Sequence, residues 1–274
     1  MQLWTYEHFY SFVPSLIAMI IITWLLRIWL IKRDIKIRII PLQVIAIFLL
    51  ILEVLKQGTS IIEKYNLYYL PFHFCSLFLF LLPAMSFYWG QHKEIVDSIT
   101  ATCEMCVFLF MIVYPALIYG AGDIQNFFNF ERFYSFHTVT YHTLVVFVMF
   151  LIIGLDLHVP SEKRYYKQLW IFIICFSIIA ATMSEIFDTN YGGFYECNIA
   201  PIEDIRQDLL KKIPYFWTQT LYLSVLIILH ILFVSGAYYL YICIQNLFTK
   251  FIRKPQSQPE IPTQQSGLTV DLVQ

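Results

Sequence analysis

The sequence predicts an all-α membrane protein, a polytopic bundle of about seven transmembrane helices. Its composition is 59% apolar and 18% aromatic, and only 14% of the 274 residues are charged. Long apolar segments alternate with short charged loops, and roughly 20 apolar residues suffice to cross a bilayer. Helices are expected because a helix satisfies its own backbone groups in lipid, and because the segments are too long and too uniformly apolar for barrel strands.

Seven segments meet this criterion, with approximate ends at 12–31, 38–56, 69–90, 95–119, 133–155, 166–187 and 218–248. We expect them to form a single seven-helix domain over residues 1–248, because the loops are too short to hold a second folded domain. Residues 249–274 are rich in Pro, Gln and Ser and predict a disordered cytoplasmic tail.

The basic residues of the loops predict the orientation, since cytoplasmic loops carry an excess of Lys and Arg. With the amino terminus outside, eleven basic residues fall on the cytoplasmic side and six on the outer side. The cytoplasmic set is Lys32, Arg33, Lys36, Arg38, Lys93, Lys163, Arg164, Lys167, Lys250, Arg253 and Lys254. We therefore predict an external amino terminus and a cytoplasmic carboxyl terminus, which an odd number of spans satisfies.

The loop between the last two predicted spans carries the pattern of an amphipathic helix. Its apolar residues recur at spacings of three and four, with charged residues between them; they are Ile202, Ile205, Leu209 and Ile213. Such a helix is suited to the outer membrane surface, either as a surface connector or as a lid over a cavity.

Ionisable side chains inside the predicted spans are candidates for function, since burying such groups in hydrocarbon is costly. The predicted orientation places His73 and Cys75 in the outer half of the third span. His142 lies in the outer to middle part of the fifth span, and Glu53 near the outer end of the second. Glu104 lies near the middle of the fourth, where a carboxylate must be paired or protonated. This distribution predicts an outward-facing polar cavity.

Other histidines and cysteines are interpreted as structural, and no metal site or cofactor is predicted. His137 and His142 are five residues apart, about 140° around a helix, so they cannot chelate an ion from one face. Cys103 and Cys106 have the spacing of a redox or metal pair, but in an apolar span they are interpreted as packing residues. His230, central in the last span, is expected to make an interhelical hydrogen bond. The net charge of −1 argues against a nucleic-acid partner.

Three short blocks carry a resemblance to a known family. They are Leu70-Pro71-Phe72-His73-Phe74-Cys75-Ser76-Leu77, the fifth-span entry Phe130-Glu131-Arg132-Phe133 with Tyr141-His142, and Asp188-Thr189-Asn190-Tyr191. In this order and spacing they resemble the YwaF-like family of bacterial integral membrane proteins, which is related to the eukaryotic transmembrane protein 164. The resemblance covers nearly the whole chain up to about residue 248, and it implies a multi-pass protein of the bacterial plasma membrane.

The resemblance also implies lipid acyl chemistry, because the eukaryotic relative is described as an acyltransferase acting on ether phospholipids through a cysteine. His73 and His142 match the membrane histidines of the family. The family cysteine aligns with Phe72 in this sequence, and Cys75, one helical turn further in, is the candidate nucleophile instead. Thr143 stands where the family usually has Gly.

A thiol nucleophile needs a base or a nearby cation to become a thiolate near neutral pH. On a helix His73 and Cys75 would lie about 200° apart, so we expect the base for Cys75 from another span, with His142 at a compatible depth. A carboxylate, Glu53 or Glu104, could orient that imidazole. The candidate catalytic residues are His73, His142, Cys75 and Glu53, and the candidate substrate-binding residues are Glu104 and, at the cavity rim, Asn190 and Tyr191.

The leading hypothesis is a membrane enzyme that transfers or hydrolyses an acyl group of a membrane lipid without a cofactor. The runner-up is a non-enzymatic transporter or a lipid- or ligand-binding protein, in which the same groups form a polar binding site. A receptor-like signalling bundle is a third interpretation.

Overall fold

The computed structural model describes residues 4–159, 165–197 and 199–252, and every regular element among them is helical. The α-helices are α1 (Tyr6–Leu30), α2 (Ile35–Arg38), α3 (Ile40–Ile62), α4 (Phe78–Phe87), α5 (Lys93–Val113), α6 (Ala121–Gln125), α7 (Phe133–Gly154), α8 (Tyr166–Ile186), α9 (Ala200–Leu210) and α10 (Tyr215–Ile252). Four 3₁₀-helices join them: η1 (Leu67–Tyr69), η2 (Phe74–Leu77), η3 (Pro115–Leu117) and η4 (Phe130–Arg132). The prediction of an all-α fold is confirmed.

Among the described residues, six helices are long and apolar enough to cross a membrane. They are α1, α3 together with α2, α5, α7, α8 and α10, and each contains most of one predicted span. A polytopic helical membrane protein is therefore confirmed, whereas the direction in which the helices cross stays a prediction. The helix α10 extends to Ile252, four residues into the predicted tail, and residues 253–274 lie outside the described part of the chain.

The prediction that 69–90 forms one continuous transmembrane helix is wrong. Its helix, α4, has only 10 residues, which is about 15 Å of rise against a hydrocarbon core of about 30 Å. Pro71 explains the interruption, because it lacks a backbone N–H and pushes the preceding residue out of helical geometry. Leu70 and His73 are accordingly extended, with ψ of 147° and 151°.

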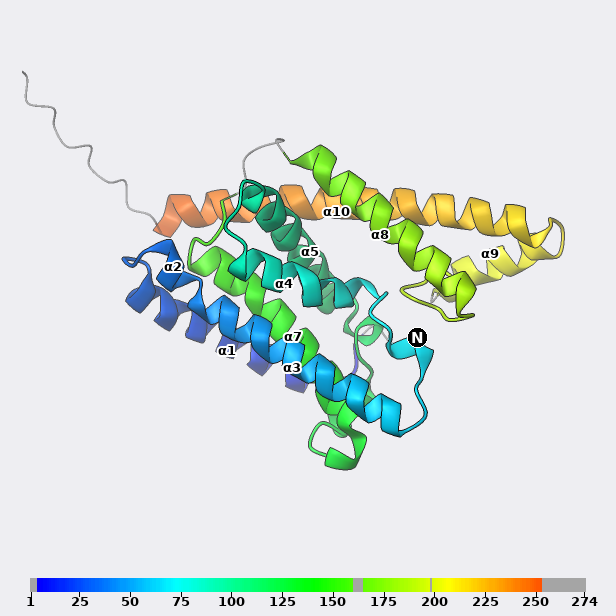
Figure 1. Cartoon of the computed structure of the whole chain (residues 1–274), viewed down its shortest axis with the longest axis horizontal. Coiled ribbons are helices and arrows are strands. Elements are labelled where there is room, and N and C mark those ends of the chain that lie inside the picture. The colour runs from blue at the N-terminus through cyan, green and yellow to red at the C-terminus, as the bar shows by residue number, and fades with distance from the viewer. Residues whose placement is uncertain (1–3, 160–164, 198, 253–274) are drawn as a thin grey trace, which may run out of the picture.

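The broken segment nevertheless runs alongside α3 from one end to the other. At one end Gln57 Nε2 donates to the Tyr69 carbonyl at 2.8 Å, and at the other Gln43 Nε2 donates to the Ser86 carbonyl at 3.0 Å. The chain therefore returns antiparallel to α3, as Figure 1 shows, with irregular backbone in the first half and α4 in the second. Irregular backbone at membrane depth is tolerated where it is buried in protein or lines a cavity.

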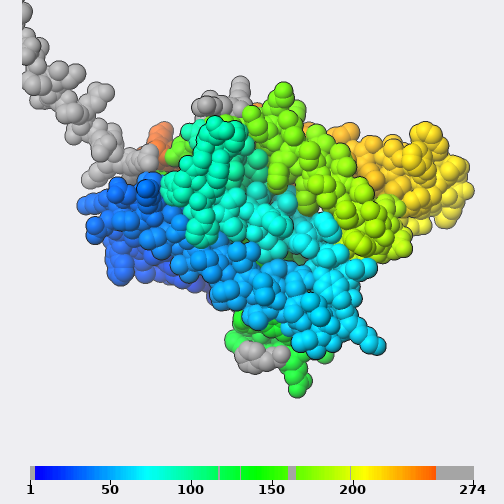
Figure 2. All heavy atoms as spheres, in the orientation of Figure 1, coloured from blue at the N-terminus to red at the C-terminus, as the bar shows by residue number. Residues whose placement is uncertain are grey.

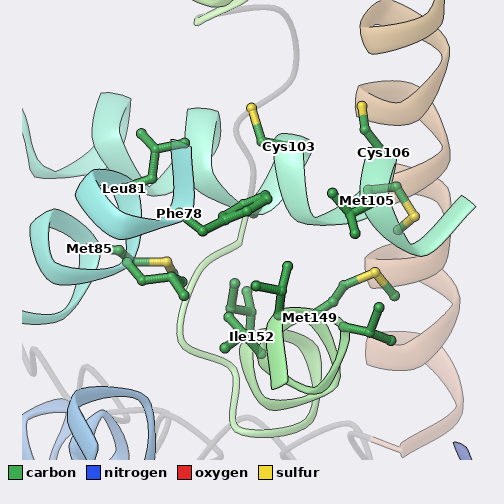
Figure 3. Close-up of a cluster of buried hydrophobic side chains, with 14 of the residues drawn as sticks. Phe78, Leu81, Met85, Cys103, Met105, Cys106, Met149 and Ile152 are labelled. Atoms are coloured by element: carbon green, nitrogen blue, oxygen red, sulfur yellow. The ribbon is translucent and has the colours of Figure 1, made fainter. Parts of the chain in front are cut away.

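The central part of the bundle is an apolar layer where α4, α5 and α7 meet. Figure 3 shows side chains of the three helices converging there, among them Phe78, Met105 and Ile152, all fully buried. Cys103 and Cys106 are also fully buried, and both are free thiols, as expected for packing residues.

Two further helices extend beyond this layer. The helix α10, with 38 residues, is about 57 Å long and is the longest helix described. Its first turns and the antiparallel α9 project past the rest of the bundle, as the yellow region of Figure 2 shows. The predicted amphipathic helix is confirmed as α9, and it turns its apolar side outward: Ile205 is 62% exposed, whereas Arg206 is buried.

The opposite end of the bundle is held by two arginines at the carboxyl terminus of α7. Arg27 of α1 hydrogen-bonds the Gly154 carbonyl and lies 3.5 Å from the Asp156 carboxylate. Arg38 of α2 donates to the Leu155 carbonyl at 2.9 Å. Asp156 adopts the left-handed conformation, with φ of 50°, in the turn that the two guanidinium groups surround.

Candidate functional site

A pocket of about 200 Å³ lies where the irregular half of the broken segment faces α3 and α7. Its lining includes Glu53 and Lys56 of α3, His73 and Cys75 of the broken segment, and a row of α7 side chains. The α7 residues are Tyr134, His137, Thr138, Tyr141 and His142. We call this space the histidine pocket. The structure thus brings together the four predicted catalytic residues Glu53, His73, Cys75 and His142.

The extended backbone at His73 changes the relation between His73 and Cys75. The angle of about 200° holds only on a helix. His73 is not helical, and the 3₁₀-helix η2 begins just after it at Phe74. Both side chains therefore line the same pocket. The angle predicted between His73 and Cys75 assumed a continuous helix, which this segment does not form.

A backbone carbonyl fixes the proton on each of the two imidazoles. His73 Nε2 lies 3.0 Å from the Tyr68 carbonyl, and His142 Nδ1 lies 2.7 Å from the Thr138 carbonyl. A carbonyl oxygen only accepts hydrogen bonds, so these nitrogens carry the protons. Nδ1 of His73 and Nε2 of His142 are then the nitrogens that can accept a proton, as a general base requires.

Aromatic residues hold His73 in place. Its ring packs edge-on against Tyr68 at 4.5 Å and against Tyr191 at 5.4 Å between centroids. Tyr191 follows α8 in sequence, and its hydroxyl donates to the Leu67 carbonyl at 2.6 Å. Tyr191, expected at the rim, is fully buried behind His73. The family cysteine position, Phe72, packs against the same tyrosine at 5.3 Å.

Glu53 is the most highly connected charged group of the histidine pocket. It forms an ion pair with Lys56 at 2.8 Å and accepts a hydrogen bond from Gln57 at 2.6 Å. His137 Nε2 lies 3.4 Å from its other oxygen, at ion-pair distance but without hydrogen-bond geometry. The imidazole that contacts Glu53 is thus that of His137 and not the predicted His142. The sequence placed His137 at the same depth as His142, but His137 was not among the predicted site residues.

The thiol of Cys75 is free, and the residue is half-buried. The Tyr141 hydroxyl donates to its backbone carbonyl at 3.1 Å, which ties η2 to α7. Cys75 therefore has a fixed backbone position between two imidazole-bearing elements.

A second pocket, of about 470 Å³, adjoins the first. It lies between α5 and α10 and reaches the α8–α9 loop (residues 187–197), from which Asn190 and Glu196 line it. We call it the α5–α10 pocket. His230 also lines it, stacked on Phe194 at 5.5 Å. Its Nδ1 bonds to the Leu226 carbonyl of its own helix, so the hydrogen bond that the structure shows is not the expected interhelical one.

Glu104 lines neither of these two pockets. Its side chain is fully buried in α5, and both carboxylate oxygens lack a hydrogen-bond partner among the described residues. Glu104 thus does not line the candidate site, although it lies within electrostatic range of Cys75. Within the described ranges no group of three or more His, Cys, Asp or Glu side chains is placed to hold a metal ion.

The α8–α9 loop is anchored by a polar network at the ends of the last two predicted spans. Gln219 Nε2 donates to Glu185 at 2.9 Å and to the Phe194 carbonyl at 3.0 Å, and its oxygen accepts from Arg206 at 3.1 Å. Arg206 also forms a two-pronged ion pair with Glu203, and these hydrogen bonds lower the pKa of Glu203 to about 2. The network fixes α9 and the loop against α10.

The loop itself depends on two glycines and one asparagine. Gly192 and Gly193 have φ of 66° and 90°, a region that residues with a Cβ rarely adopt. Asn190 Nδ2 donates to the Glu196 carbonyl at 3.0 Å, and its Oδ1 accepts from the Tyr195 N–H at 3.2 Å. Asn190 thus closes the loop that covers one end of the α5–α10 pocket.

The fold and these pockets define a polytopic helical membrane protein whose broken third segment lies at its candidate site. The model of the TMEM164 family matches residues 3–235, which is most of the chain. The protein belongs to the TMEM164 family. No curated protein and no solved structure matched the chain.

Proposed function

We propose that this protein is a membrane enzyme that transfers or hydrolyses an acyl group of a lipid, with chemistry in the histidine pocket. The observation that carries the proposal is the set of side chains around that pocket. One thiol, Cys75, lies among two imidazoles, His73 and His142, each with one ring nitrogen left as a proton acceptor. A thiol with such a base is the arrangement that nucleophilic acyl transfer requires.

In the proposed reaction an imidazole takes the proton of the Cys75 thiol, and the sulfur attacks the ester carbonyl carbon of the lipid. The C–S bond forms, the ester C–O bond breaks, and the leaving alkoxide takes the proton from the imidazolium. A hydroxyl of a second lipid, or water, then attacks the thioester while the imidazole accepts its proton. The thiolate that leaves recovers the proton. Lys56, beside Glu53 in the same pocket, supplies positive charge that suits a lipid phosphate.

A non-enzymatic lipid-binding or transport protein is the second candidate. It is favoured by Phe72, which stands at the aligned position of the family cysteine and packs against Tyr191. A protein that kept the pocket and lost the reaction would need His73 and His142 for binding but not Cys75 for turnover.

The test is the detection of an acyl-enzyme on the purified protein. The wild type, Cys75→Ala and the control Cys175→Ala are incubated with a phospholipid whose acyl chain carries an alkyne. Cys175 is an exposed thiol on α8, away from the histidine pocket, so its substitution should change nothing. We expect hydroxylamine-sensitive labelling of the wild type and of Cys175→Ala, and none of Cys75→Ala.

Full turnover in Cys75→Ala would show that Cys75 is a packing residue. Absence of turnover in the wild type, with binding that still depends on His73 and His142, would favour the second candidate.

A further inference from the structure

The histidine pocket and the α5–α10 pocket meet at the candidate nucleophile. Four residues line both of them, and these are Tyr68, His73, Cys75 and Ile118. A molecule whose reacting carbon lies beside Cys75 is therefore in reach of both pockets at once. Its two ends would then lie in different surroundings.

The two pockets differ in the chemistry of their walls. Glu53, Lys56 and His137 bring charged and polar groups to the histidine pocket. The α5–α10 pocket is lined by six apolar side chains, Phe74, Val107, Phe110, Ile118, Phe233 and Val234. Asn190 and Glu196 bring polar groups to its loop end, and His230 lies on its α10 wall. This second space is also the larger, at about 470 Å³ against about 200 Å³.

We propose that the α5–α10 pocket binds the acyl chain of the substrate and sets its preferred length, an inference that rests on the function proposed above. The apolar side chains of this pocket offer contacts to the methylenes of a chain whose ester carbonyl lies beside Cys75. The charged histidine pocket then receives the polar part of the same amphiphile. The ester carbonyl lies at the junction, beside Cys75.

Two small residues form the end of the α5–α10 pocket that is remote from the α8–α9 loop. Val107 lies one turn from Phe110 on α5, and Val234 lies one turn beyond His230 on α10. Both valines are buried, at 0% and 1% exposure. The last methylenes of a bound chain would contact them, so a larger side chain at either position shortens the space available.

The experiment compares the chain-length preference of Val234→Phe with that of the wild type. The control is Val225→Phe, the same substitution on the same helix at a position that is 49% exposed. Turnover is measured with lipid esters of graded acyl length. With donors that are monomeric in water, each methylene that no longer enters costs on the order of fourfold in binding, so exclusion of three methylenes lowers the relative rate of the longer donors by about 60-fold. Val225→Phe should keep the wild-type profile.

An unchanged length profile in an active Val234→Phe would overturn the proposal. If Val234→Phe does not fold, Val107→Leu adds a smaller volume at the same end and should shift the preference by about one methylene. A Val107→Leu profile identical to that of the wild type would count against the proposal equally.

A wild type without any turnover would refute the proposed function and not this inference. Binding then gives the readout, as the shift in thermal unfolding produced by lysophospholipids of graded chain length. A shift that grows with length in the wild type and stops growing at a shorter chain in Val234→Phe supports a chain-binding pocket. A shift independent of chain length in the wild type, or identical in the two proteins, overturns it.

Discussion

The hydroxyl of Tyr191 is predicted to stabilise the segment that carries His73 and Cys75. Tyr191→Phe keeps the ring packed against His73 but removes the hydrogen bond to the Leu67 carbonyl, which is 2.6 Å long. Loss of one partner of a buried hydrogen bond costs about 1–3 kcal/mol. Leu67 is 41% exposed, so water can reach its carbonyl, and the lower part of this range, about 1–2 kcal/mol, applies here. That free energy corresponds to a roughly 5- to 30-fold larger population of the opened segment.

The rate of modification of Cys75 by a thiol reagent reports this opening, because a half-buried thiol reacts faster when its segment opens. We expect Tyr191→Phe to accelerate the labelling by that factor and to lower the free energy of global unfolding by the same amount, about 1–2 kcal/mol. The control is Tyr195→Phe, in the same loop, whose hydroxyl makes only an exposed 3.4 Å contact with Asp188. Equal labelling rates in Tyr191→Phe and the wild type would refute the claim that the tyrosine holds the segment.

Three further outcomes are expected. Arg27→Met removes the ion pair with the Asp156 carboxylate and the hydrogen bond to the Gly154 carbonyl, and should lower the free energy of unfolding by about 1–3 kcal/mol; unchanged stability in denaturant would contradict these contacts. The pKa of Glu203 is about 2 in the folded protein and 4.5 ordinarily, so its pairing with Arg206 stabilises the fold fully above pH 4.5 and is lost as the pH falls through about 2. Glu203→Gln should therefore flatten the dependence of the unfolding free energy on pH in that range. An identical pH dependence in the variant would show that the pair contributes nothing. A cysteine introduced within 255–274 should resist impermeant thiol reagents in intact cells and react after permeabilisation, whereas labelling from outside would reverse the predicted orientation.

The long helices could be predicted because apolar length and a lack of charge suffice to identify them. Apolar length could not reveal the interruption of the third segment, because 69–90 is equally apolar whether it is helical or not. The signal was present in Pro71, which restricts both itself and Leu70. Hydropathy averages over a window, whereas a break depends on a single residue.

The sequence predicts how deep each candidate residue lies in the membrane, but not toward which neighbour its side chain points around the helix axis. Depth along the predicted spans placed Glu53, His73 and His142 at similar levels, and all three line one pocket. Which face of a helix turns inward depends on packing against its neighbours, which one sequence does not specify. For this reason the contact of His137 with Glu53 and the position of Glu104 outside both pockets were not predicted.

The interrupted third segment has a consequence for how the protein enters the membrane. A continuous apolar helix can leave the insertion machinery alone, but residues 70–77 leave backbone groups that lipid cannot satisfy. Gln57 of α3 bonds to the Tyr69 carbonyl and Gln43 to the Ser86 carbonyl, near the two ends of the third segment (69–90). Helix α3 must therefore already lie beside that segment. We therefore expect α3, α4 and α5 to insert as one cooperative unit. A nascent chain that ends near residue 90 should hold its third segment only weakly in the bilayer.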